Sequence, residues 1–314
     1  MDIKNISYTV LATTNLAALN VGGMTIDMYC NKLKSKKNID EKVTEYIIVD
    51  EISMMKEYFY KMLHTIKMFK PDTKFILCGH FEQFEVVNDR VGQQNDSYYS
   101  DSGIFHELVS SNIIHLSKCR RSDDKHFKNC QNYRNIKVSD YANSEDTNLH
   151  ICYTNVKRCE LNKICMDKHE KRVKAENDAH KKHGHSKIRY SLAKNLDKNP
   201  YSKISQDVFL FEDCPIISIT NKKDLKIVNG ERFEISDITE EFIEAKNRLK
   251  TKTIEIPMNL FQKYFHVAFA ITCHKSQGQT IKQPYTIHEW DTMSRKAKYV
   301  SLSRGAKYED VNLV

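Results

Sequence analysis

The chain has 314 residues, of which 40% are hydrophobic and 29% charged, which is the composition of an ordinary soluble globular protein. At about 100–200 residues per domain, this length allows two domains. Lys and Arg number 49 against 41 Asp and Glu, and the net charge of +8 suits a polyanionic partner, although many basic proteins simply carry a solvated surface.

The nine cysteines are scattered singly, and no C-x-x-C pair occurs. Neither a zinc site nor a redox dithiol is therefore indicated. Free cysteines in apolar runs behave as small hydrophobic residues, so we expect an intracellular, reducing location in the cytoplasm or nucleus. We expect no membrane partner, because the sequence shows no signal-peptide pattern and no apolar run near the length of a membrane span.

Predicted strands and helices alternate through residues 1–117. Four apolar runs bounded by turn residues are predicted strands: 8–12, 46–50, 75–79 and 113–116. Three segments are predicted helices: 16–20, a short stretch after Gly23, and 54–69. The charged segment 32–42 is expected to be a solvated loop. This order of elements favours a doubly wound parallel sheet.

The second of these strands ends in two adjacent carboxylates, Asp50 and Glu51. In open α/β sheets, ligands bind at the carboxyl edge of the strands. Phosphoryl transfer to water needs one carboxylate to hold Mg²⁺, directly or through water, and a residue that orients and deprotonates the attacking water. Asp50 and Glu51 are placed for these two roles. The alternative is a buried strand followed by an acidic helix N-terminus, where Asp and Glu are favoured electrostatically.

A second series of strands begins near residue 149. The predicted strands of this series are 149–153, 215–221, 225–235, 266–271 and 298–302. Residues 157–174 are a predicted helix, and the polar, basic segment 176–203 is expected to be an insertion or a mobile surface segment. Short β segments between 226 and 265 are expected to form a small barrel-like insert, with Asn229-Gly230 as a hairpin turn.

Two motifs near the C-terminus carry a family resemblance. Residues 270–280 are A-I-T-C-H-K-S-Q-G-Q-T and residues 299–304 are Y-V-S-L-S-R. Behind the Walker B-like D-E-I-S-M at 50–54, this order of motifs resembles that of superfamily 1 helicases of the RecD/PIF type. Further matches lie at 10–25, 79–83, 116–121, 154–155 and 228–230. The Walker B stretch alone is weak, whereas the two C-terminal motifs in the correct order are specific.

The resemblance spans nearly all of the chain. It implies an α/β fold of two RecA-like (P-loop NTPase type) parallel-sheet lobes, the first N-terminally truncated, with a small β insert in the second. The expected domains are 1–117 for the first lobe, 118–225 and 266–314 for the second, and 226–265 for an SH3-like insert. It also implies an ATP-dependent DNA helicase or translocase that moves 5′→3′ on single-stranded DNA, with ATP and Mg²⁺ as cofactors.

The same resemblance gives roles to residues around the nucleotide, which would bind between the lobes. Asp50 would hold Mg²⁺, and Glu51 would position and polarise the attacking water. Gln83 would sense the γ-phosphate by hydrogen bonding. Gly278 and Gln279 would support the nucleotide region from the second lobe.

Two arginines resemble arginine fingers, Arg121 and Arg304. A planar guanidinium that is always charged suits the spread charge of a transferring phosphoryl group. The alternative for each is a surface or interdomain salt bridge. Taken singly, Arg121 favours that alternative, but Arg304, inside its matched motif, does not.

Residues expected to contact single-stranded DNA come from both lobes. Their side chains and backbone N–H groups suit phosphate contacts: Thr13, Thr14, Thr25, Asn155, His274, Lys275 and Ser276. Binding of a single strand without sequence preference needs phosphate contacts and stacking faces rather than readout of base edges.

The chain departs from the family in its phosphate-binding loop. No G-x-x-x-x-G-K-[ST] segment occurs in the 314 residues. The N–H groups and Lys of that loop neutralise the β- and γ-phosphates, and its Ser or Thr binds Mg²⁺. We therefore expect the chain alone to bind ATP weakly and hydrolyse it little, as a fragment or as a split subunit whose Walker A segment comes from a separate chain. In addition, His80 stands where the family usually has Asp, and Arg120 where an aromatic residue is common.

Three hypotheses follow. The first is a helicase motor seen as a fragment or split subunit, and the second is a non-catalytic, single-strand nucleic-acid-binding remnant of such a motor. The third is an unrelated α/β ATPase, which is disfavoured because six or more motif matches in order rarely coincide. DNA-stimulated ATP turnover that is abolished by Glu51→Gln would favour the first over the second, so whether the chain is an enzyme stays open at this point.

Overall fold

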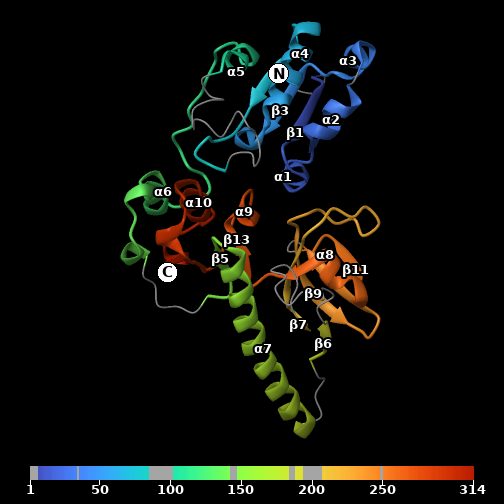
Figure 1. Ribbon diagram of the computed structural model, residues 1–314, viewed down its shortest axis with the longest axis vertical. Coiled ribbons are helices and arrows are strands. Elements are labelled where there is room, and N and C mark those ends of the chain that lie inside the picture. Colours follow the sequence, from blue (N-terminus) through green and yellow to red (C-terminus); the bar gives the residue numbers. More distant parts are fainter. Residues whose placement is uncertain are drawn as a thin grey trace. The chain divides into compact units, whose positions relative to one another are not determined.

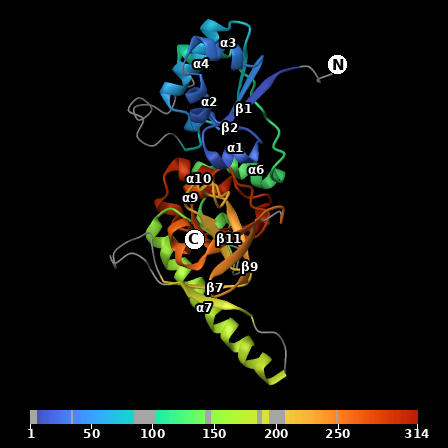
Figure 2. The same cartoon turned by 90° about the vertical axis from the view of Figure 1, so that its right-hand side faces the viewer.

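The chain divides at residue 119 into two units, Met1–Cys119 and Arg120–Val314. The computed structural model describes residues 6–33, 35–84, 102–141, 147–183, 188–193, 207–247 and 250–314. Figures 1 and 2 show the helices and strands of each unit from two directions.

The first unit is built on a four-stranded sheet in which all neighbouring strands run parallel. The strands lie in the order β2 (Met24–Thr25), β1 (Tyr8–Ala12), β3 (Tyr46–Asp50) and β4 (Lys74–Leu77). The α-helices are α1 (Asn15–Asn20), α2 (Ile26–Lys32), α3 (Lys36–Lys42), α4 (Glu57–Phe69) and α5 (Gly103–Leu108), with a 3₁₀ turn at Ile52–Met54. Ala12 lies opposite Asp50 in the register, so the carboxyl ends of β1 and β3 meet at one edge of the sheet. The predicted parallel sheet is confirmed.

One apolar core holds this sheet against its helices. Leu11, Ile47 and Val49 of β1 and β3 are all 0% exposed, and so are Leu63 and Ile66 of α4, which belong to the same core. The spacing of three residues between Leu63 and Ile66 places both on one side of the helix. Each fully buried aliphatic side chain contributes about 1.5–3 kcal/mol to the stability of the fold, so the burial of Leu63 and Ile66 holds this side of α4 against the core.

The segment 32–42, predicted to be a solvated loop, contains the helix α3 instead. The Ser35 hydroxyl accepts a hydrogen bond from the N–H of Asn38 at 3.2 Å and caps the start of the helix. Ile39 is 4% exposed and joins the core of the unit. The Ser35 cap and the burial of Ile39 thus stabilise a helix here despite the surrounding lysines.

The prediction of a strand at 113–116 is wrong, because residues 112–119 form neither helix nor strand. Ile114 and Leu116 are 85% and 91% exposed. A run of β-branched and apolar residues makes a strand only where a neighbour supplies ladder hydrogen bonds. Within the described part of the chain, no strand pairs with this segment.

The second unit contains another parallel sheet, again as predicted. Its strands lie in the order β13 (Ala270–Thr272), β5 (His150–Cys152), β14 (Tyr285–Ile287) and β15 (Val311–Leu313), and every residue in them is buried. The α-helices of the unit are α6 (Asp124–Gln131), α7 (Asn155–His183), α8 (Phe261–Tyr264), α9 (Cys273–Ser276) and α10 (Arg295–Leu302). Short 3₁₀ turns lie at Tyr133–Asn135, Val138–Tyr141, Met258–Leu260, Trp290–Thr292 and Tyr308–Asp310.

An antiparallel sheet forms the other part of the second unit, drawn in yellow to orange in Figure 1. Its strands lie in the order β11 (Thr253–Pro257), β10 (Phe242–Asn247), β9 (Arg232–Ile238), β8 (Pro215–Ser218) and β12 (Phe265–Val267), and β6 (Tyr190–Ala193) pairs with β7 (Val208–Phe211). Buried residues alternate along β9, where Phe233 and Ile235 face the core. The sheet therefore begins before the expected insert 226–265 and ends after it.

Two apolar runs near the C-terminal motifs differ from their predictions. The run 266–271 is not one strand, because β12 pairs in the antiparallel sheet and β13 in the parallel one. Residues 298–302 lie in α10, where the Ser294 hydroxyl accepts from the N–H of Ala297 at 3.3 Å and caps the helix. Ala297 and Val300 are both 0% exposed at helical spacing. A short apolar run alone cannot distinguish a buried helix from a buried strand.

The helix predicted at 157–174 is longer than expected, since α7 spans 29 residues. Figures 1 and 2 show it running from the parallel sheet past β7 and beyond it. The Asn177 side chain accepts from Ile188 N at 2.8 Å and donates to Ile188 O at 3.0 Å, so part of the segment 176–203 is ordered by this pair. Within the described residues, no helix is long and apolar enough to cross a membrane.

The close packing at Gly79 generates a stability prediction. A Cβ at this position would lie 2.7 Å from Ile52 Cγ1 and 2.8 Å from Ile52 N. We expect Gly79→Ala to lower the free energy of unfolding of the first unit by about 1–3 kcal/mol, because the turn after β3 would have to move. The measurement is the denaturant midpoint of the full chain.

Gly103→Ala is the matched control, since a Cβ there meets nothing within 4 Å at the start of α5. It should leave the midpoint unchanged or raise it slightly. Equal midpoints for the two variants would contradict the packing argument.

Candidate nucleotide and DNA sites

The two adjacent carboxylates lie in a strained turn at the end of β3. Glu51 has φ 54° and ψ 48°, the left-handed region, and its N–H donates to Asp50 Oδ1 at 2.9 Å. Both residues are half-buried. A residue other than glycine in this region costs about 1–2 kcal/mol, and such strain gathers where function needs a fixed geometry.

The turn is held from two directions. The Tyr60 hydroxyl on α4 donates to Ile52 O at 3.1 Å, and Ile52 N donates to Cys78 O, also at 3.1 Å. Gly79 lets the chain after β4 pass against Ile52 without a clash. The segments with the Walker B-like and motif III-like residues are therefore packed side by side, as two neighbouring parallel strands require.

Gln83 lies on the loop that leaves this contact. It is half-buried, and its N–H donates to His80 O at 3.0 Å. His80 Nδ1 accepts from the N–H of Glu82 at 3.2 Å. The imidazole at the position usually held by Asp thus acts as an acceptor that shapes the loop, which is a structural role that an acid could also fill.

The carboxylate of Asp50 fits a hard divalent cation. One of its oxygens accepts from the Glu51 amide, and the carboxylate is partly open at the sheet edge. Among the described residues, no cluster of three or more His, Cys, Asp or Glu could hold a metal ion. Mg²⁺ commonly uses one or two protein carboxylates together with water and phosphate oxygens, and a single Asp at this edge is compatible with that.

In the second unit, the residues expected at the nucleotide gather around one buried guanidinium. Arg304 is 1% exposed and donates to Val300 O at 2.9 Å, to Ser303 Oγ at 2.8 Å and to Gln279 O at 3.4 Å. Arg121 is exposed and donates to Ser303 O at 3.4 Å. Residues 182 positions apart in the sequence are thus brought to the same loop.

Gly278 and Gln279 link this loop to the helix α9. Gly278 has φ 76°, which turns the chain back after the helix. The Gln279 side chain donates to Lys275 O at 2.7 Å, while its backbone carbonyl accepts from Arg304. Gln279 therefore contacts both a residue expected at the nucleotide and one expected at DNA.

A buried histidine that sequence reasoning missed supports Arg304. His126 on α6 is 0% exposed, with Nε2 at 3.0 Å from Leu302 O and Nδ1 at 2.9 Å from the Tyr141 hydroxyl. Burial lowers the pKa of His126, so the ring is neutral at physiological pH. Because a carbonyl can only accept, Nε2 carries the proton and the Tyr141 hydroxyl donates to Nδ1. The Tyr285 hydroxyl donates to Ser301 O at 3.0 Å and holds the same helix end.

The threonines expected to contact DNA lie at the carboxyl edge of the first sheet. The hydroxyl oxygens of Thr14 and Thr25 cap α1 and α2, accepting backbone N–H groups at 3.1 and 3.3 Å. Each hydroxyl keeps its proton for another acceptor such as a phosphate oxygen. Thr13 donates to Glu51 O at 3.4 Å, so this stretch is tied to the strained turn.

The residues of α9 differ in their access to solvent. His274 is exposed and Lys275 half-buried, whereas Ser276 is 0% exposed and its hydroxyl donates to Cys273 O at 2.8 Å. The Ser276 side chain therefore serves the helix itself. His274 and Lys275 are the members of this motif that are open to a phosphate.

Asn155 belongs to a group around a second missed residue, Arg158. Arg158 Nε donates to Asn155 Oδ1 at 3.2 Å, and burial together with the charge of Arg158 lowers the pKa of Lys275. The Lys275 ammonium donates to Asn229 Oδ1. A single basic residue in a helix is an ordinary surface feature, so no sequence signal separates Arg158 from its neighbours.

Glu289, also missed, occupies the start of α7. Its carboxylate accepts from the N–H groups of Tyr153 and Thr154, both at 2.9 Å, and from the Thr154 hydroxyl at 2.8 Å. A carboxylate at a helix N-terminus is favoured by the helix dipole. The N–H groups of Tyr153 and Thr154, just before α7, are therefore already paired within the chain.

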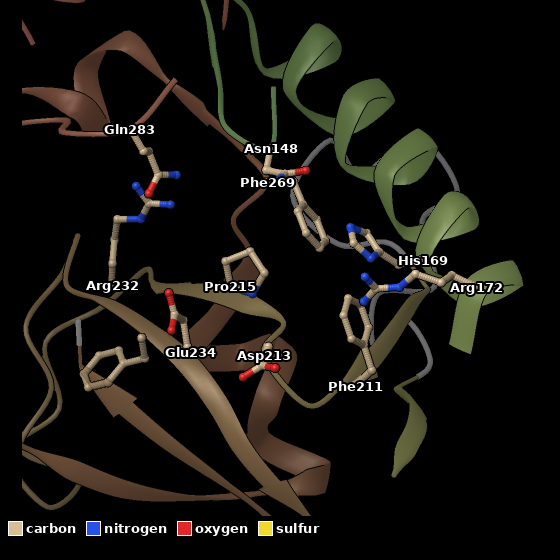
Figure 3. A pocket seen from close by; sticks show the side chains of 11 residues that line it. Asn148, His169, Arg172, Phe211, Asp213, Pro215, Arg232, Glu234, Phe269 and Gln283 are labelled. Atoms are coloured by element: carbon tan, nitrogen blue, oxygen red, sulfur yellow. The ribbon is translucent and has the colours of Figure 1, made fainter. Parts of the chain in front are cut away.

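A pocket of about 310 Å³ in the second unit contains none of these residues. His169 of α7 stacks 4.9 Å from both Phe211 and Phe269, while Arg232 and Glu234 stand on the opposite wall (Figure 3). Phe211 and Phe269 are only 2% and 4% exposed. The rings act as packing between α7 and the antiparallel strands and leave little aromatic surface for a ligand.

Comparison with known proteins gives one consistent relationship. No protein-family model matches the chain. The ATP-dependent DNA helicase Pif1 of Campylobacter jejuni is 25% identical, over 94% of this chain and 79% of the relative. Pif1 helicases solved in a study of unwinding at forked double-stranded DNA give a TM-score of 0.64 at 20% identity, covering 99% of this chain and 82% of theirs. Bacteroides Pif1 in complex with ADP-AlF3 and single-stranded DNA gives a TM-score of 0.61 at 20% identity, covering 99% and 83%. The chain is thus similar to Pif1 helicases in sequence, and it shares their fold.

Proposed function

We propose that the chain is the motor part of an ATP-dependent DNA helicase that moves 5′→3′ along single-stranded DNA. The observation that carries the proposal is the double contact of Gln279, with Lys275 O at 2.7 Å and with the Arg304 guanidinium at 3.4 Å. A motor must couple ATP hydrolysis to movement along the DNA strand, and such coupling travels through residues that contact one another. A residue that touches both candidate sites gives such a path.

In this proposal, the chain has two RecA-like lobes, the first ending near residue 117 and the second interrupted by the insert 226–265, and each lobe contributes residues that bind ATP. Asp50 holds Mg²⁺, which neutralises charge on the phosphate oxygens when bound. Glu51 takes the proton of the attacking water, and Gln83 hydrogen-bonds the γ-phosphate. Arg121 and Arg304 stabilise the charge that spreads over the transferring group.

The strand lies on the threonine hydroxyls at the edge of the first sheet and on Asn155, His274 and Lys275 of the second unit. Backbone N–H groups near Ser276 complete the contact there. All of these groups suit phosphate oxygens rather than base edges. The complex of Bacteroides Pif1 with ADP-AlF3 and single-stranded DNA supports a paired nucleotide and strand site in a protein of this fold.

A second candidate function is a non-catalytic single-strand-binding remnant. His80, at the motif III position where the resembled family usually has Asp, favours it. In either case we expect these residues alone to turn over ATP slowly. Supply of a Walker A segment by a separate chain stays a prediction, and turnover would then rise when that chain is added.

The first test replaces the proposed base. Glu51→Gln keeps the size of the side chain but cannot take a proton, so we expect strand-stimulated ATP turnover to fall by about 100-fold or more, with strand affinity unchanged. The measurement is phosphate release with and without oligothymidine.

Glu41→Gln is the control, since Glu41 is exposed on α3 and pairs only loosely with Lys37 at 3.8 Å. This variant should hydrolyse ATP at the rate of the parent chain. Full turnover by Glu51→Gln would remove the motor proposal, and an inactive parent chain that still binds the strand would support the remnant.

The second test concerns the mode of strand binding. Phosphate contacts predict that oligothymidine and a mixed-sequence strand of equal length bind within about threefold of each other. They also predict that affinity falls by about 10-fold or more between roughly 50 and 200 mM salt. Fluorescence anisotropy at several salt concentrations measures both quantities. A strong sequence preference, or an affinity indifferent to salt, would contradict this mode.

A further inference from the structure

Arg158 is a cation built into the structure of the second unit. It lies in the first turn of α7 and is 9% exposed. Its guanidinium donates to Asn155 Oδ1 and to Cys159 Sγ, both at 3.2 Å, and lies 3.5 Å from His266 Nδ1 on β12. Arginine is seldom buried to this degree unless its donors are used. The side chain is therefore held in place and is not a solvated surface charge.

A second cation lies close to it. Lys275 on α9 is half-buried, and its ammonium donates to Asn229 Oδ1 in the turn before β9. Burial, and then the positive charge of Arg158, lower the pKa of Lys275. Two like charges in a partly desolvated place repel each other, and an anion bound there relieves the repulsion.

The contacts of both cations cross from the parallel to the antiparallel sheet. Arg158 and Lys275 stand on helices that follow β5 and β13, whereas His266 and Asn229 belong to the antiparallel part. Gly230, with φ 90°, turns the chain beside Asn229, and its N–H donates to Ser218 O at 2.9 Å. The Asn229 turn is thereby anchored on β8. The two cations thus stand where the two parts of the unit meet.

We propose that Lys275, with Arg158 behind it, forms a seat for one phosphodiester group of the single strand, and that Asn229 and His266 tie this seat to the antiparallel sheet. Lys275 contacts the phosphate, and Arg158 is a positioning residue that adds charge and orients Asn155. A phosphate oxygen accepts charge-assisted hydrogen bonds, which are stronger than those between neutral groups. Strand binding therefore tightens the antiparallel part against the parallel sheet. This inference rests on the proposed strand-binding function.

The test measures affinity for an oligothymidine of about 15 nucleotides by fluorescence anisotropy on the full chain. Arg158→Gln should weaken binding by roughly 10-fold at low salt and reduce the salt slope by about one. Arg158→Lys keeps the charge and should restore most of the affinity. Arg172→Gln is the matched control on the same helix, an exposed arginine paired with Glu176 at 3.8 Å, and should change affinity less than about twofold.

A second readout follows the link between the two sheets. Hydrogen exchange of the N–H groups at 227–231 should slow when the parent chain is saturated with the strand. In Asn229→Ala, whose side chain is exposed and outside the core, the strand should still bind but this protection should be lost. Protection that is absent in the parent chain, or equal in the two proteins, overturns the link.

The variants also separate the two proposals. If the parent chain does not bind the strand at all, the proposed function fails. If the parent chain binds and Arg158→Gln binds as Arg172→Gln does, only the phosphate seat fails. Should Arg158→Gln unfold, Lys275→Gln decides, because a strand affinity equal to that of Arg172→Gln would overturn the seat.

Discussion

The candidate sites of the second unit depend on the two hydrogen bonds of Gln279. Its side chain donates to the Lys275 carbonyl in α9, and its backbone carbonyl accepts from the buried guanidinium of Arg304. Gly278, in the left-handed region, lets the chain reverse after only four helical residues so that both contacts form. A displacement of α9 therefore moves an acceptor of Arg304, and a change at Arg304 pulls on the helix that carries Lys275.

In the first unit, the candidate site depends on a strained backbone turn at Glu51. Glu51 is held in a left-handed conformation while Tyr60, Cys78 and Gly79 fix the turn that follows. This backbone strain costs about 1–2 kcal/mol, which is small compared with the free energy that the buried core contributes to folding. The Thr13 hydroxyl, which follows β1, donates to the Glu51 carbonyl, so the sheet edge that carries the threonines is tied to the strained turn.

Much of the fold was predictable from the sequence wherever a residue pattern has a single structural explanation. The apolar run ending at Asp50 and the order of the C-terminal motifs predicted both parallel sheets, while the roles of the site residues stay a prediction. Context decided the rest. Residues 298–302 became a helix because Ser294 caps it, and 113–116 lost its strand because no described strand pairs with it. Arg158, His126 and Glu289 could not be foreseen, since only the fold brings their partners to them.

Two of the missed residues, Glu289 and His126, share a physical role, which is to pair backbone groups at or beside a helix end. Glu289 accepts from the N–H groups of Tyr153 and Thr154 just before α7, while His126 and Tyr285 donate to the last carbonyls of α10. Capping by residues distant in sequence ties each helix end to another element, whereas a local cap would leave it free to shift. Because burial keeps His126 neutral and its Nε2 donates to Leu302 O, this ring helps to hold the helix end two residues before Arg304, together with the Tyr285 hydroxyl at 3.2 Å from the same carbonyl. The guanidinium itself donates to Val300 O, Ser303 Oγ and Gln279 O, so it is fixed both by its own helix end and by the loop after α9.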